Sequence, residues 1–134
     1  TNLDRLLQRI DEVAASLAAT FKDSDQPYIA YHDAFQYFEH ENGLNYVGSI
    51  SFDEETSSSL KHLRDISDII EQKDVHCLVY QPPEPAIIGT LIKHTSADAV
   101  ALDPLGLEAN KPADAWFEIM QTIAADLHQC LNSK

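Results

Sequence analysis

The fold of this chain is decided by the stretch YIAYHDAF, residues 28–35. An apolar run from Tyr28 to Tyr31 ends at His32 and Asp33, and an aromatic-rich helical pattern follows at once. A short and nearly continuous apolar run is typical of a strand that is buried on both faces of a parallel sheet. The stretch therefore predicts a buried strand followed directly by a helix, with an imidazole and a carboxylate at the junction.

The same alternation of strand and helix patterns continues along the chain. Short apolar runs predict strands at 28–31, 44–52, 75–80 and 99–102. Apolar residues spaced three and four apart predict helices at 1–21, 33–41, 60–73, 86–94 and 112–131, with a polar loop at 53–59. In the helix at 33–41, Phe35, Tyr37 and Phe38 are expected on the packing side. Strands that alternate with helices predict an α/β fold whose four-stranded, mainly parallel sheet is flanked by helices.

Composition and charge limit the classes of protein. With 134 residues, 44% of them hydrophobic and 23% charged, the chain has the composition of one ordinary globular domain. The net charge of −13 argues against a nucleic-acid partner, whose phosphates would be repelled. No apolar run approaches the roughly 18 residues that span a membrane. Cys77 and Cys130 form no C-x-x-C motif, so the residues alone allow either two buried thiols or one disulfide.

Two polar residues follow predicted strands at one edge of the sheet. His32 follows the first strand and Asp103 the fourth, and ligands of open α/β sheets bind at the carboxyl ends of the strands. Position alone allows a packed histidine with Asp33 as the helix cap, and a turn role for Asp103. The functional interpretation is a metal ligand or an acid–base group. The remaining histidines form no short ligand pattern and are interpreted as surface or packing residues: His40, His62, His76, His94 and His128.

Two segments carry a resemblance to a known family. YHDAFQYFEHENGL (residues 31–44) and LDPLG (residues 102–106) resemble the C-terminal lobe of the periplasmic zinc-binding proteins of bacterial zinc ABC transporters, within the zinc/manganese solute-binding family. The resemblance covers essentially the whole chain. It implies that residues 1–22 are the C-terminal part of the helix joining two lobes, and that residues 23–134 are the C-terminal metal-binding lobe. It also implies a periplasmic protein without enzymatic activity that passes zinc to a membrane permease.

The resemblance assigns roles to the residues at the sheet edge. The family binds its metal in the cleft between two lobes, so His32 and Asp103 match ligands from the C-terminal lobe. A histidine at this position, where manganese members have glutamate, favours zinc as the transported metal. In several zinc members water replaces the carboxylate, so Asp103 is expected to donate an oxygen or to hold a water. Asp33 is expected to cap the following helix and to orient the site without touching the metal.

The resemblance has further consequences for the rest of the chain. It implies a disulfide between Cys77 and Cys130 that ties the final helix to the sheet. The N-terminal lobe and its histidines are absent from this sequence, and Gln36 stands where the family usually has glycine. We therefore expect a fragment with an incomplete site that binds zinc weakly. The alternatives are manganese or iron capture, a small α/β enzyme with His32 and Asp103 as an acid–base pair, or an interaction domain without a site.

Overall fold

The structure, a computed structural model of the chain, describes residues 1–51 and 60–133. Each predicted helix and strand is present. The expected loop at 53–59 lies outside the described residues, as does residue 52 at the end of the second expected strand. In chain order the elements are α1 (Asn2–Phe21), β1 (Pro27–Ala30), α2 (Gln36–Glu41), β2 (Asn45–Ser49), α3 (Leu60–Gln72), β3 (Cys77–Tyr80), α4 (Ala86–His94), β4 (Asp98–Ala101), the short 3₁₀ helix η1 (Pro112–Asp114) and α5 (Ala115–Leu131).

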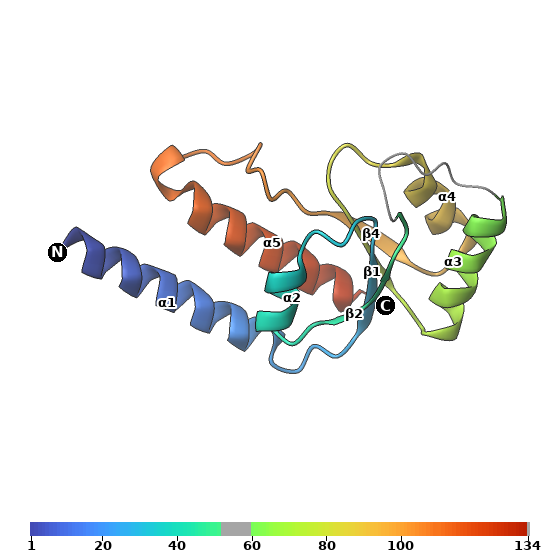
Figure 1. Cartoon of the computed structure of the whole chain (residues 1–134), viewed down its shortest axis with the longest axis horizontal. Helices are drawn as coiled ribbons and strands as arrows, with labels where there is room; N and C mark the ends of the chain where they lie inside the picture. The colour runs from blue at the N-terminus through green and yellow to red at the C-terminus, as the bar shows by residue number, and fades with distance from the viewer. Residues whose placement is uncertain (52–59, 134) are drawn as a thin grey trace.

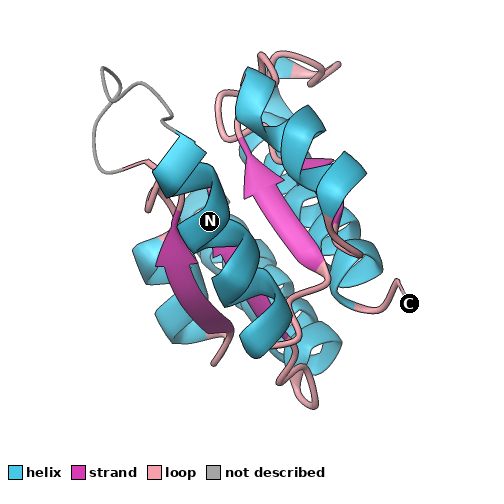
Figure 2. Ribbon diagram, turned by 90° about the vertical axis from the view of Figure 1, so that its right-hand side faces the viewer, coloured by secondary structure: helices cyan, strands magenta, loops and turns pink. Residues whose placement is uncertain are grey.

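The four strands form one parallel sheet in the order β2-β1-β3-β4. Successive side chains of a strand point to opposite faces, and in β1 Tyr28 and Ala30 join one core cluster while Ile29 joins the other. The first cluster includes residues of α1 and α5, and the second includes residues of α3 and α4. Helices thus cover both faces of the sheet (Figures 1 and 2), which confirms the predicted α/β architecture.

The long helix α1 is fixed to α5 at one end of the molecule. A capping box begins α1, with the Thr1 hydroxyl accepting from the Asp4 backbone N–H at 3.2 Å. Further along, the Arg9 guanidinium lies 3.9 Å from the centre of the Phe117 ring and donates to Asp114 Oδ1 at 2.7 Å. The first turns of α1 project beyond the sheet (Figure 1). They carry three exposed leucines: Leu3, Leu6 and Leu7.

The predicted disulfide is present. Cys77 in β3 and Cys130 in α5 are bonded, with their Cα atoms 5.5 Å apart. Both cysteines are buried in the cluster between the sheet and α5. The bond therefore joins the last helix to a central strand, as the resemblance implies.

The start of α2 differs from the prediction. This helix begins at Gln36, after an N-terminal flanking residue, Phe35, with φ −120° and ψ 26°, and no side chain caps it. Residues before it form a turn in which the Ala34 N–H donates to the His32 carbonyl at 3.0 Å. The prediction that Asp33 caps this helix is therefore wrong. Its carboxylate is left at the sheet edge, beside His32.

None of the helices within the described residues is both long enough and apolar enough to cross a membrane.

Candidate metal site

His32 lies just beyond the end of β1, at the carboxyl edge of the sheet. The backbone around it stays anchored, since the Tyr31 N–H donates to the Val79 carbonyl at 2.7 Å and the Ser51 N–H donates to the Tyr31 carbonyl at 2.9 Å. The His32 ring meets the Tyr31 ring edge to face, with centroids 4.7 Å apart. These contacts hold a half-buried imidazole at a defined place on the sheet edge.

The His32 imidazole borders a cleft of about 660 Å³, which we call the His32 cleft. Its walls come from the loop after β1, from β2 with the residues after it, and from α3. The lining residues are His32, Asp33, Tyr46, Gly48, Ser49, Ser51, His62, Asp65, Ile66 and Ile69. The side chains include nitrogen and oxygen donors of the kinds that zinc accepts. The cleft therefore places nitrogen- and oxygen-bearing side chains around His32.

His62 also lines this cleft, which sequence reasoning did not predict. Its Nε2 lies 2.5 Å from the Ile50 carbonyl oxygen, an atom that can only accept, so Nε2 is the donor. The order of strands and helices along the chain could have predicted this position of His62. A helix that follows a strand of a parallel sheet begins at the carboxyl edge of that sheet, and His62 lies in the first turn of α3.

Asp103 follows β4 at the same sheet edge but lies in a different hollow. That hollow, of about 480 Å³, is formed by Pro82, the loop after β4 and α5. The Asp103 carboxylate accepts from the backbone N–H groups of Leu105 and Glu108, at 3.1 and 3.4 Å. The loop turns back at Gly106, whose φ of +68° favours glycine. Asp103 thus organises its own loop in this structure.

The sheet order explains why His32 and Asp103 are apart. Strand β3 lies between β1 and β4, so the ends of these two strands are separated by about 10 Å. Within residues 1–51 and 60–133, no three His, Cys, Asp or Glu side chains gather closely enough to hold a metal ion. The described part of the chain therefore holds no complete metal shell around His32.

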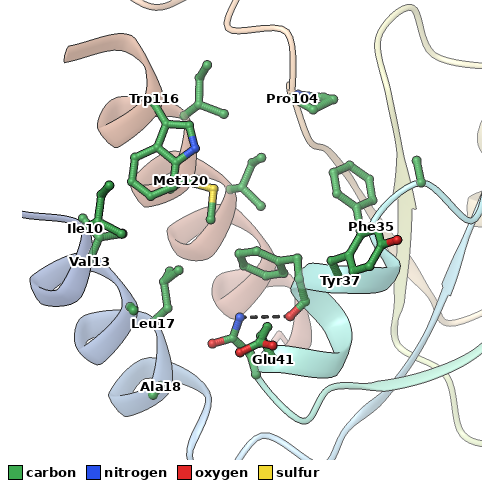
Figure 3. Close-up of a pocket in the computed structure, with 16 residues that line it drawn as sticks. Ile10, Val13, Leu17, Ala18, Phe35, Tyr37, Glu41, Pro104, Trp116 and Met120 are labelled. Atoms are coloured by element: carbon green, nitrogen blue, oxygen red, sulfur yellow. Dashed lines mark hydrogen bonds between the residues drawn. The ribbon is translucent and has the colours of Figure 1, made fainter. Parts of the chain in front are cut away.

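A third hollow, of about 610 Å³, separates α1, α2 and α5. Figure 3 shows Trp116 and Met120 from α5 and Leu17 from α1 along it, with Phe35 near its opposite end. Its lining is largely apolar and contains no imidazole. Among the described residues, this groove therefore lacks the cluster of donor side chains that a metal site needs.

Comparison with known proteins identifies the family. The model of the zinc-uptake complex component A, periplasmic, matches residues 1–130. A relative from Brucella suis biovar 1, the high-affinity zinc uptake system protein ZnuA, is 32% identical over 127 residues, which are 93% of this chain and 38% of the relative. The protein of the same name from Haemophilus ducreyi is also 32% identical over 127 residues, 94% of this chain and 40% of the relative.

Solved structures agree on the fold. A crystal structure of ZnuA superposes with a TM-score of 0.79 at 16% identity, over 98% of this chain and 47% of that one. A Zn(II)-bound mutant of AdcAII from Streptococcus pneumoniae gives 0.77 at 20% identity, over 98% of this chain and 48% of that one. This chain spans less than half the length of these curated relatives and about half of these solved structures. The chain belongs to the zinc-uptake complex component A (ZnuA) family.

Proposed function

We propose that this chain is the C-terminal metal-binding lobe of a periplasmic protein that captures zinc and delivers it to an ABC importer, without catalysing a reaction. The relatives are named high-affinity zinc uptake system proteins, which supports zinc as the cargo. The observation that carries the proposal is the position of His32, whose imidazole borders a cleft at the carboxyl edge of a central strand. Imidazole nitrogen is a preferred zinc donor.

Each residue at the sheet edge has a proposed role. His32 donates a ring nitrogen to zinc, and Asp103 donates an oxygen or holds a water. Asp33, exposed in the same cleft as His32, orients the ligands without touching the metal. The role of Asp103 requires a zinc position between the two hollows, because its carboxylate lies outside the His32 cleft.

The remaining ligands are proposed to come from an N-terminal lobe. More than half of the length of the relatives lies outside the region matched by this chain. We propose that residues 1–22 are the end of the helix joining the lobes and that residues 23–134 are the C-terminal lobe. The exposed leucines on the first turns of α1 fit a helix face that packs against a second lobe. The membrane permease of the importer is the proposed receiver of zinc.

The 134-residue chain on its own is expected to bind zinc weakly. The binding free energy of a four-ligand structural zinc site is about 10–16 kcal/mol. One or two ligands therefore supply about 3–6 kcal/mol, which corresponds to a Kd of roughly tens of micromolar or weaker. Isothermal titration with zinc at neutral pH measures this value. Nanomolar one-to-one binding by this chain would contradict an incomplete site.

A further inference from the structure

Glu39 is buried in a place where charged residues are rare. It is 7% exposed and is the only buried residue of α2. A carboxyl group loses hydration when it is buried, and this loss is tolerated only where hydrogen bonds replace the water. Glu39 therefore needs a structural reason to face inward, while Tyr37 on the same helix is 90% exposed.

The partner of Glu39 lies on the strand that leads to His32. The Tyr28 hydroxyl donates to Glu39 Oε2 at 2.5 Å, and Tyr28 is itself 2% exposed. This bond links β1 to α2 across residues 31–35, the segment that contains His32 and Asp33. The buried hydrogen bond thus joins the strand before the His32-bearing segment to the helix after it.

Glu39 also lies behind the wall of the His32 cleft. Asp33 and Tyr46 line this cleft, and they also line an adjoining hollow that contains Glu39. Three titratable groups from outside α2 interact electrostatically with Glu39 among the described residues: Tyr28 in β1, Tyr46 in β2 and Asp33 in the preceding loop. On its own helix, His40 lines the same adjoining hollow.

The state of the Glu39 carboxyl follows from these neighbours. Burial raises its pKa above the ordinary value, the hydrogen bond from Tyr28 offsets part of this, and the nearby Asp33 carboxyl raises the pKa further. A protonated Glu39 can accept from Tyr28 with one oxygen and offer its proton to Asp33 with the other. Both polar neighbours would then be satisfied at the same time.

We propose that Glu39 is a positioning residue for the metal site, because its bond to Tyr28 ties α2 to β1 on either side of residues 31–35 and so helps to fix where the His32 ring meets zinc. The proposal rests on the proposed function, in which His32 binds zinc. Glu39 does not contact the metal, and it acts through the backbone segment that carries His32. Glutamine is the closest replacement for a protonated Glu39. Its amide has the same shape as the protonated carboxyl group, and it carries both a hydrogen-bond acceptor and a hydrogen-bond donor.

The test compares Glu39→Gln, Glu39→Ala and Tyr28→Phe with the unchanged chain. Zinc chloride is titrated into each folded protein at neutral pH, and the His32 ring nitrogens are followed by NMR. Glu39→Gln is expected to keep the zinc affinity within about twofold of the unchanged chain. Glu39→Ala and Tyr28→Phe are expected to lower it by about five- to tenfold. This loss is at the low end of, or below, the roughly 10- to 100-fold loss typical of residues that orient metal ligands. Glu41→Gln, an exposed change on the same helix, is the control and should change nothing.

Each outcome decides between roles. Equal zinc affinity in all folded variants, with only thermal stability lowered, would overturn the positioning role. Tyr28→Phe removes the hydroxyl but keeps the ring in the core, so this variant still tests the hydrogen bond if Glu39→Ala fails to fold. If zinc does not move the His32 signals in the unchanged chain, the proposed function fails first. If it moves them and Glu39→Ala and Tyr28→Phe do not alter the affinity, only the role of Glu39 fails.

The pH dependence of stability gives a second readout. The pKa of Glu39 is raised in the folded state. Its contribution to the free energy of unfolding is therefore fully present below the unfolded pKa of about 4.3. This contribution is lost as the pH rises through the folded pKa. The unchanged chain should therefore lose stability relative to Glu39→Gln over the pH range above the unfolded pKa. A constant difference across this range would show that Glu39 titrates alike in both states.

Discussion

Replacing Cys77 and Cys130 together by alanine is expected to lower the free energy of unfolding by about 4 kcal/mol. The two residues are 53 positions apart, and closing a loop of that length removes much of the entropy of the unfolded chain. Both side chains are buried, so alanine fits without leaving an unsatisfied polar group. A loss of this size is a large fraction of the stability of a small domain.

Urea unfolding followed by circular dichroism measures the loss. The matched control is the unchanged chain with its disulfide reduced, which should lose a similar free energy. A serine pair should lose more, because each buried hydroxyl would need a hydrogen-bond partner. A loss below about 1 kcal/mol in the alanine variant would show that the packing of α5 on the sheet, and not the bond, holds this helix.

Replacing His32 by alanine is expected to weaken zinc binding by about a hundredfold. One ligand of a four-ligand site contributes about 3 kcal/mol, which corresponds to roughly that factor. In the 134-residue chain this change moves the Kd from tens of micromolar into the millimolar range. The fold should remain, because His32 is half-buried at the sheet edge and lies outside both core clusters.

His62→Ala is the matched control for His32→Ala. His62 lines the same cleft, but its Nε2 donates to the Ile50 carbonyl and its ring is not assigned to the metal. Zinc affinity of His62→Ala should stay within about threefold of the unchanged chain, as measured by titration calorimetry. Equal losses in the two variants would mean that the zinc site uses both rings, and a loss in His62→Ala alone would remove His32 from its role.

The sheet and its helices could be predicted because local patterns agree with the final packing. The apolar run at 28–31 largely coincides with β1 (Pro27–Ala30), and the other expected strands pair with it or with each other in parallel. The start of α2 could not be predicted this way. Phe35 packs against a core cluster with non-helical φ and ψ, so tertiary packing overrides the local helical pattern and delays the helix to Gln36.

The buried face of α2 also differs from the prediction. The sequence pattern placed Tyr37 on the packing side, yet Tyr37 is exposed and Glu39 is buried. Apolar periodicity cannot identify a buried carboxyl, because the reason for its burial is a tyrosine hydroxyl on another element. The same limit applies to His62, whose place in the cleft follows from a crossover connection rather than from its neighbours in sequence.

The candidate site was predicted in part for a related reason. Parallel strands bring their carboxyl ends to one edge, which correctly places His32 and Asp103 on the same side of the sheet. Their separation depends on strand order, and the order β2-β1-β3-β4 inserts β3 between them. Asp103 also satisfies two backbone N–H groups in its own loop, a role that its strand-end position alone leaves open.

The central claim is that His32 is the zinc ligand of this lobe, and its most direct test is a zinc titration of the 134-residue chain labelled with ¹⁵N at histidine. Long-range proton–nitrogen spectra report each imidazole separately. We predict that the His32 ring nitrogens shift and saturate at one zinc per chain, while four other rings stay unchanged: His40, His76, His94 and His128. Zinc-dependent shifts at any of those rings, with the His32 signals unmoved, would contradict the claim.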